Sequence, residues 1–262
     1  MQFLGKLFKK KPEPVAGRRH LVFDTVPAAI FAIGDVHGCI DLARRMEDEI
    51  AHVAANIAGE SWIIYLGDYV DRGPASAQMI DFLMARQGAG LRRLCLAGNH
   101  EEQMLSFMLK PAGDHHWLNF GGEETLKSYG VQDLQRLRKQ LPTVVASHIP
   151  EEHIEFLDGL PSMIRFPGLC FVHAGLKHGV ALEDQVDADL LWIRPDREEA
   201  EHGGPVMDGP LVVHGHTPVK QVERIGNRIN LDTGAYFTGR LSCLKLAGNK
   251  PDSVLEVGGG NS

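Results

Sequence analysis

The sequence has few cysteines and no regular spacing between them. Its 262 residues include four cysteines and no C-x-x-C pair, which argues against a disulfide framework and a zinc knuckle. Isolated cysteines suit a reducing compartment, so we expect core thiols in a cytoplasmic protein. No run of eighteen apolar residues occurs, so we expect no transmembrane segment. The first residues also lack the apolar stretch of a signal peptide.

The sequence also lacks an excess of positive charge. The formal net charge is −7, which provides no general electrostatic reason to bind nucleic acid, and we expect no such partner. Residues 1–20 are a local exception, with six Lys or Arg against one Glu and apolar residues interleaved. We interpret them as a basic flexible tail, and weak contact with an anionic membrane surface is the alternative.

The hydrophobic content is sufficient for a full core. Hydrophobic residues make up 44% of the chain, and a chain of this length can form one large α/β domain. We expect that domain to span residues 21–250. The Gly-rich, polar residues 251–262 are expected to be a flexible C-terminal tail.

Three segments repeat a plan of apolar strand, polar loop and helix. AAIFAI leads into GDVHG, SWIIYL into GDYVDRG, and LRRLCL into AGNHE, with helices expected over about 40–58, about 75–86 and through Leu109. From Asp35 to Asp68 is 33 positions and from Asp68 to Asn99 is 31. This spacing is typical of βαβ units, so it predicts parallel strands.

The second half of the chain follows a different pattern. Residues 111–165 are expected to form a mostly helical and looped insert near the site, and residues 111–161 within it are expected to overhang the site as a lid or substrate wall. Further strands are expected in GLCFVHAGL, PLVVHGHTPV, RINLDTGA and GRLSCLKLAG, and the first two lead into histidine motifs. Ligands bind at the carboxyl ends of strands in such sheets, so we expect the polar loops to converge there.

The polar residues of these loops predict a metal centre. An Asp and a His at i and i+2 on an extended segment point the same way and can reach one cation. Alone, such a pair is more often a turn. Here further candidate ligands follow other strand-like runs, which gives the set Asp35, His37, Asp68, Asn99, His173 and His216. Mixed oxygen and nitrogen ligands suit manganese, iron or zinc better than magnesium or calcium. Six ligands are too many for one tetrahedral ion with an open position, and a carboxylate can bridge two ions. We therefore predict two divalent metal ions, with manganese as the first choice.

The motifs GDVHG, GDYVDRG, GNHE, HAG and GHT, in this order, resemble those of the phosphoprotein phosphatase family of calcineurin-like metallophosphatases. The resemblance extends over about residues 29–246. FLDGLP before FVHAGL, LDTGAYFTGRLSCLKL and WLNFGGEETLKSYG are similar to the bacterial and bacteriophage lambda-type serine/threonine protein phosphatases. The fold that this implies is a calcineurin-like α/β/β/α sandwich, in which two mixed β-sheets are flanked by helices.

The resemblance also implies a role for each ligand. Asp35 and His37 would bind one metal, and Asp68 would bridge both. Asn99 and the histidines of HAG and GHT would complete the set. His214, in HGHT, has no ligand role in the family pattern, and we expect it to be a core residue or a support for the ligands.

Phosphate ester hydrolysis requires further groups. Two bound cations can lower the pKa of water from about 15.7 toward about 7, so the expected nucleophile is a hydroxide held by both metals. Arg72 and Arg194 are suited to bind phosphoryl oxygens, with Asn99 also on the substrate side. His100, with an ordinary pKa of about 6.5, is the expected general acid. The resemblance implies that Asp71 orients His100.

The leading functional prediction is a serine/threonine protein phosphatase acting on phosphoproteins or phosphopeptides. Hydrolysis of dinucleoside polyphosphates, such as diadenosine tetraphosphate, is the alternative, because relatives with the same metal motifs carry it out. A catalytically inactive metal-binding scaffold is a third hypothesis. It expects a broken ligand set or a missing acid, whereas every motif residue is present. The oligomeric state stays open.

Overall fold

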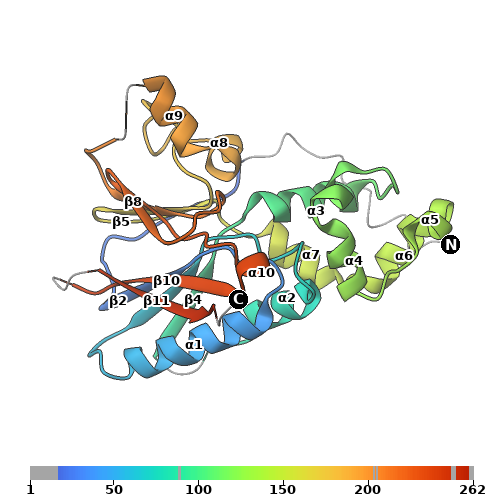
Figure 1. Ribbon diagram of the computed structural model, residues 1–262, viewed down its shortest axis with the longest axis horizontal. Helices are drawn as coiled ribbons and strands as arrows, with labels where there is room; N and C mark the ends of the chain where they lie inside the picture. Colours follow the sequence, from blue (N-terminus) through green and yellow to red (C-terminus); the bar gives the residue numbers. More distant parts are fainter. Residues whose placement is uncertain (1–16, 88–89, 203, 205, 249–251, 260–262) are drawn as a thin grey trace.

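Two mixed β-sheets lie face to face, with helices on both outer sides (Figure 1). The computed structural model describes residues 17–87, 90–202, 204, 206–248 and 252–259. The predicted sandwich of two mixed sheets flanked by helices is confirmed. Within these ranges, no helix combines the length and the apolar character needed to cross a bilayer.

The five-stranded sheet contains the three strands of the repeated plan. Its order is β11 (Ser253–Gly258), β10 (Arg240–Leu246), β2 (Ala29–Ile33), β3 (Ser61–Tyr65) and β4 (Leu91–Cys95). Strands β2, β3 and β4 are parallel, as predicted, whereas β10 is antiparallel to β2. Every residue of β2 and β3 is buried. A central strand covered on both faces must be apolar throughout, which explains these continuous hydrophobic runs.

The six-stranded sheet carries the histidine motifs. Its order is β1 (His20–Val22), β5 (Met163–Phe166), β6 (Leu169–Val172), β7 (Leu211–His214), β9 (Arg228–Asn230) and β8 (Glu223–Ile225). Strands β6, β7 and β9 are parallel neighbours. A buried core between the two sheets includes Ile30, Ile64, Phe171 and Val213. Hydrophobic burial therefore joins the sheets and brings the loops that follow their strands together.

Helices cover both outer faces. α1 (Ile40–Ala54), α2 (Ser76–Met84) and α3 (Asn99–Leu109) pack with the outer side of the five-stranded sheet, and α8 (Asp187–Trp192) and α9 (Pro195–His202) lie beyond the other sheet (Figure 1). The buried positions of α1 recur every three or four residues, as expected for one apolar face: Ile40, Ala43, Met46 and Ile50. All four cysteines are free, three are buried, and Cys39 is partly buried.

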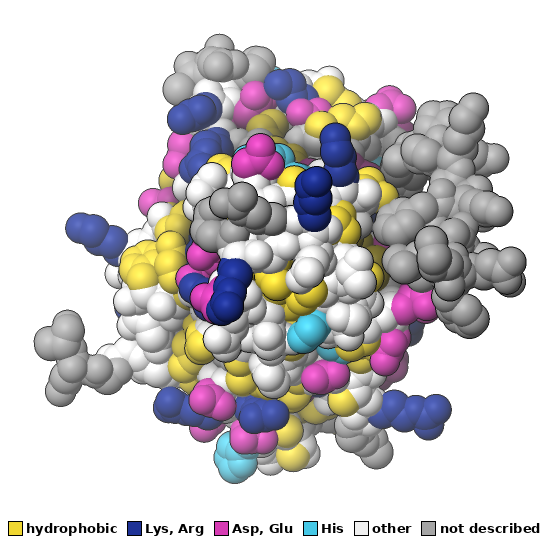
Figure 2. Space-filling model, turned by 90° about the vertical axis from the view of Figure 1, so that its right-hand side faces the viewer, with side chains coloured by type: hydrophobic (Ala, Val, Ile, Leu, Met, Phe, Trp, Pro, Cys, Tyr) yellow, Lys and Arg dark blue, Asp and Glu magenta, His cyan; other side chains and the backbone are white. Residues whose placement is uncertain are grey.

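The insert predicted at 111–165 folds mostly into short helices beside α3 (Figure 1). They are η1 (His116–Phe120), α4 (Gly122–Ser128), α5 (Leu134–Leu137), η2 (Arg138–Gln140), α6 (Leu141–His148) and α7 (Glu151–Asp158). The prediction was wrong at the end of this range, where β5 pairs with β1 and β6. On the face seen in Figure 2, side chains of both charge signs are interspersed, so this outer side is an ordinary solvated surface.

The C-terminal boundary differs from the prediction. Residues 251–262 were expected to be flexible, but β11 lies within them and forms six residue pairs with β10. Val254, Leu255 and Val257 favour a strand, and Val257 is buried. The surrounding glycines and polar residues gave the segment the composition of a tail and so hid the strand.

The N-terminal boundary also differs from the predicted start at residue 21. The Arg18 guanidinium donates hydrogen bonds to the carbonyl oxygens of Leu157 and Leu160, and β1 begins at His20. The ordered domain therefore includes the end of the predicted basic segment. Residues 1–16, with the predicted membrane contact, lie outside the described residues.

Candidate metal centre

The loops after six strands meet at one place between the sheets. Those after β2, β3 and β4 come from one sheet, and those after β6, β7 and β9 come from the other. The predicted ligands lie on five of these loops and the sixth carries Asp232. All of the ligands are buried except His216, which is partly buried. The structure thus brings together side chains that are far apart in the sequence.

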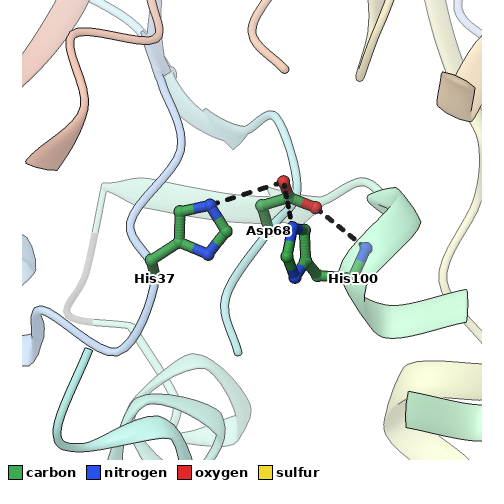
Figure 3. Close-up of side chains that lie close together, drawn as sticks. All are labelled: His37, Asp68 and His100. Atoms are coloured by element: carbon green, nitrogen blue, oxygen red, sulfur yellow. Dashed lines mark hydrogen bonds and ion pairs between the residues drawn. The ribbon is translucent and has the colours of Figure 1, made fainter. Parts of the chain in front are cut away.

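Asp68 lies between two groups of candidate ligands. Its Oδ2 is 3.6 Å from His37 Nε2 and 3.9 Å from His100 Nε2, and Figure 3 shows the three side chains converging. Its Oδ1 is 3.4 Å from His173 Nε2. The geometry defines one group of His37, Asp68 and His100, and a second group of Asp68, His173 and His216, with ligand atoms within 4.8 Å of one another. A residue shared by both groups occupies the position that a bridging ligand requires.

Asn99 belongs with the second group. Its Oδ1 lies 2.9 Å from His173 Nε2 and 2.9 Å from His216 Nδ1. The amide oxygen and the two imidazoles therefore converge on one another. These three are the residues that the resemblance implied would complete the ligand set, and the structure brings them together.

Asp35 lies beside these groups but belongs to neither of them. Its carboxylate accepts the backbone N–H of His216, with Oδ2 3.0 Å from the nitrogen. A Cβ atom at Gly215 would overlap with Asp35 Oδ1, so the glycine of GHT lets this backbone approach the carboxylate. Burial, and then the negative charges of Asp232 and Asp68, raise the pKa of Asp35 well above its ordinary value.

The backbone of the centre adopts an uncommon conformation. Six non-glycine residues in the described ranges have positive φ, and five of them are predicted site residues: His37, Asp68, Asp71, Arg72 and His216. Non-glycine residues with positive φ are uncommon and cluster at functional sites, where the surrounding structure enforces them. The fold therefore holds these side chains at a cost in backbone energy.

The protonation states at the centre suit a divalent cation. Burial lowers the pKa of both His37 and His216 to about 3, and it also lowers that of His173. These imidazoles are therefore neutral at pH 7, which metal ligation requires. Burial, and then the negative charge of Asp68, raise the pKa of Asp232 to about 6. Neutral imidazoles, carboxylates and an amide oxygen match the ligand preferences of divalent transition metals, so the residues present fit the predicted ions.

His100 is held by a buried carboxylate. Its Nδ1 lies 2.6 Å from Asp71 Oδ2. Asp71 also accepts hydrogen bonds from Trp117 Nε1 at 2.8 Å and from Thr125 Oγ1 at 2.7 Å. Burial alone lowers the pKa of His100, but Asp68 and Asp71 outweigh it, so the pKa is raised. His100 can thus carry a proton beside the candidate ligands, as a general acid must.

The two predicted phosphate-binding arginines lie in different surroundings. Arg72 Nη1 is 2.9 Å from His37 Nε2, and its guanidinium lies over the Tyr236 ring, 5.0 Å from the ring centre. Arg194 is exposed and lies immediately before α9. Burial is the main cause of the lowered pKa of His216, and the charge of Arg194 contributes to it. Arg72 is therefore in the centre, whereas Arg194 stands at its edge and its phosphate contact stays a prediction.

The residues assembled here have the ligand types and the shared carboxylate of a dinuclear phosphoesterase. A profile of calcineurin-like phosphoesterases matches residues 28–259. The chain belongs to this family. It is therefore a metallophosphoesterase, and the predicted hydrolase chemistry with divalent metals is confirmed at that level.

Two curated relatives are asymmetrical bis(5'-nucleosyl)-tetraphosphatases named PrpE. The protein from Geobacillus thermodenitrificans is 27% identical over 230 residues, which cover 81% of this chain and 88% of the relative. The protein from Bacillus thuringiensis is 26% identical over 229 residues, with the same shares. These relatives bear the name of the alternative substrate class, so they do not support the predicted serine/threonine specificity.

Solved structures support the fold. One that is described as a candidate diadenosine tetraphosphatase has a TM-score of 0.64 at 20% identity and covers 94% of this chain and 100% of its own. A Saccharomyces cerevisiae protein serine/threonine phosphatase with similarity to human PP5 has a TM-score of 0.55 at 13% identity, and the match covers 94% of this chain and 84% of that chain. At these identities the likeness concerns the phosphoesterase fold alone.

Several residues of this phosphoesterase site were not assigned from the sequence. Glu101 accepts backbone N–H groups of Gly98, Asp68 and Tyr69 at 2.7–2.8 Å, so it fastens the Asp68 loop to the start of α3. An acid in the first helical turn after a ligand was the available signal. Asp232 follows β9, as the predicted ligands follow their strands, so the same local pattern could have marked it. Thr125 and Trp117, in contrast, act through contacts between distant segments. No local pattern marks such residues.

Glu101→Gln is expected to weaken manganese binding about 10- to 100-fold, the usual effect of losing a residue that orients ligands. In the wild type, these backbone N–H groups share the two carboxylate oxygens of Glu101. The glutamine amide presents an NH₂ group in place of one oxygen, so the Asp68 loop loses support. Isothermal titration with Mn²⁺ measures the effect, with the exposed Glu123→Gln as the matched control. Equal affinities of the two variants would contradict this role of Glu101.

Proposed function

We propose that the protein hydrolyses dinucleoside polyphosphates, with diadenosine tetraphosphate as the representative substrate. Asymmetrical cleavage would release a nucleoside triphosphate and a nucleoside monophosphate. The observation that carries the proposal is the similarity to asymmetrical tetraphosphatases over 81% of the chain. The family match includes every candidate ligand from Asp35 to His216.

The proposed mechanism assigns a task to each group around Asp68. When bound, two divalent cations supply the positive charge that polarises the phosphoryl group and lowers the pKa of water. Arg72 grips phosphoryl oxygens with its planar guanidinium, and Arg194 does so from the edge of the site. Asn99 turns its Oδ1 toward two histidines, so its contact with the substrate would come from Nδ2.

His100 is proposed to protonate the leaving oxygen. Its Nδ1 donates to Asp71, which fixes the ring and leaves Nε2 facing Asp68 at 3.9 Å. The raised pKa keeps a proton available on Nε2 near neutral pH. Asp71 thereby positions the acid without touching the substrate.

A second candidate, phosphoserine or phosphothreonine hydrolysis, is favoured by the same His100–Asp71 pair. An alkoxide is a strong base and requires a proton as it leaves, whereas a nucleotide phosphate leaves readily as an anion. A buried acid with a raised pKa is therefore most useful for an ester. The inactive scaffold has no such support, because all the motif residues are present and the ligand groups converge.

A substrate panel separates the two candidates. With manganese-loaded protein, we expect kcat/KM for diadenosine tetraphosphate to exceed that for a phosphothreonine peptide by about tenfold or more. Chromatography should find ATP and AMP in equal amounts, with metal content measured on the same sample. A reversed preference would replace the proposal by the second candidate. Absence of turnover of both substrates and of p-nitrophenyl phosphate would favour the scaffold.

A further inference from the structure

The exposed aromatic residues gather around the metal centre. Within the described ranges, four Phe, Tyr or Trp side chains are exposed: Phe120, Trp192, Tyr236 and Phe237. Phe120 precedes Gly121, whose carbonyl oxygen accepts the backbone N–H of Arg72. The rings of Tyr236 and Trp192 lie near the candidate ligands His37 and His216, and the Phe237 ring packs against Tyr236. Large rings are mostly buried in soluble proteins. Exposed rings gathered at one site indicate a ligand that covers them.

Tyr236 lies on the side of the first ligand group. It is in α10 (Ala235–Thr238), and its ring centre is 5.4 Å from that of His37. The Arg72 guanidinium lies over this ring, and the Phe237 ring centre is 5.0 Å away at a steep angle. These contacts hold the ring in place, yet 40% of Tyr236 stays exposed.

Trp192 lies on the side of the second ligand group. Its ring centre is 6.5 Å from that of His216. The indole Nε1 donates a hydrogen bond of 2.7 Å to Glu102 Oε2, which fixes the ring at the end of α8. The side chain is 38% exposed. A ring that is fixed and still exposed is a preorganised binding surface.

We propose that Tyr236 and Trp192 form a nucleobase-binding site that flanks the metal centre. This deepens the proposed function and rests on it. His37 and His216 belong to different groups that share Asp68, so the two rings stand on different sides of the position for phosphate. A nucleotide held there carries a planar base close to its phosphate. Base stacking on aromatic rings depends little on base identity, so the site accepts adenine and guanine alike.

The site also separates nucleotides from phosphopeptides. Phosphoserine and phosphothreonine carry no planar group near the phosphate, so stacking on these rings strengthens nucleotide binding only. Arg72 is within reach of both the stacking ring and the position for phosphate, because it contacts the Tyr236 ring and the candidate ligand His37. It can therefore hold the phosphate while the base covers the ring beside it.

The test compares two ligands that differ by a nucleoside. Manganese-loaded protein is titrated calorimetrically with adenosine 5'-(α,β-methylene)diphosphate and with methylenediphosphonate, in excess Mn²⁺. The Kd of methylenediphosphonate divided by the Kd of the adenosine ligand isolates the contribution of the nucleoside. The adenosine ligand carries one base, so the alanine variant of the ring that holds it, Tyr236→Ala or Trp192→Ala, is expected to reduce the ratio about tenfold, or about 1.4 kcal/mol. Tyr236→Phe and Trp192→Phe retain a ring and should retain the ratio.

Three outcomes overturn the proposal. They are a wild-type ratio near unity, an unchanged ratio in both alanine variants, or an equal loss of affinity for both ligands. The last would mean that Tyr236 only positions Arg72. Turnover of diadenosine tetraphosphate is measured separately. An intact ratio without that turnover would reject the proposed function and retain the nucleobase site.

Tryptophan fluorescence provides an independent readout. Trp62 and Trp117 are buried, with 6% and 0% exposure, so Trp192 is the exposed indole of the three. The adenosine ligand should quench its emission and methylenediphosphonate should not. The quenching should disappear in Trp192→Phe. Undiminished quenching in that variant would remove Trp192 from the site.

Discussion

Asp68→Asn is expected to lower kcat/KM about 1,000-fold or more, equivalent to about 4 kcal/mol of transition-state stabilisation. Asp68 is the residue shared by both ligand groups. The neighbouring histidines His173, His100, His37 and His216 offset the effect of its burial and hold its pKa below the ordinary value, so it is ionised at neutral pH. Asparagine retains the shape and removes the charge.

The metal content of this variant should fall together with its activity. Plasma mass spectrometry of the purified protein measures manganese, and circular dichroism checks the fold. Asp41→Asn is the matched control, because that side chain is 91% exposed and far smaller effects are expected at the surface. An Asp68→Asn protein that keeps two metals and near-normal turnover would refute the shared-ligand assignment.

His100→Asn is expected to retain bound metal while slowing hydrolysis of poor leaving groups about 100- to 10,000-fold, the usual range for a lost general acid. Hydrolysis of p-nitrophenyl phosphate should slow less, because nitrophenolate leaves without a proton. The measurement is kcat for a phosphothreonine peptide, p-nitrophenyl phosphate and diadenosine tetraphosphate, each beside metal analysis. The exposed His148→Asn is the control.

Loss of metal in His100→Asn would contradict the acid role. His100 lies in the same group as His37 and Asp68, so such a loss would make it a ligand. Asp71→Asn provides a second check, because it removes the negative charge that helps to raise the pKa of His100 and leaves one acceptor oxygen in place of two. We expect it to shift the pH dependence of kcat for the peptide and to leave metal content unchanged. An unchanged pH profile would mean that Asp71 has only a structural role.

Much of the metal centre was predictable because its signals are local. Strands β2 and β3 are short buried runs and β4 is a short, partly buried one, and each leads directly into a loop that combines glycine with polar residues. Parallel pairing follows from the helix between each pair of strands, and it brings the ends of the strands to one edge. That reasoning predicted that Asp35, His37, Asp68 and Asn99 converge, and the structure brings them together, while their role as ligands stays a prediction. It also found the two histidine motifs on the other sheet.

The same local reasoning failed where a segment depends on distant partners. β11 is a strand because β10 offers it an edge, although its composition is that of a tail. β5 lies within the expected helical insert because β1 and β6 lie beside it. Local composition does not report a neighbour that is far away in the sequence, and pairing outweighs propensity in strands.

The sequence alone determined the class of chemistry, because the types of ligand residue and their order require only the identities of the residues. The tertiary structure decided how those residues are used. It placed Asp68 between the two groups of candidate ligands. It brought Trp117 and Thr125 into hydrogen bonds with Asp71, the partner of His100. It also left Tyr236 and Trp192 exposed beside the candidate ligands. Each of these depends on distances of a few ångströms between distant segments. Such distances are set by packing of the two sheets and the insert, which no local pattern encodes.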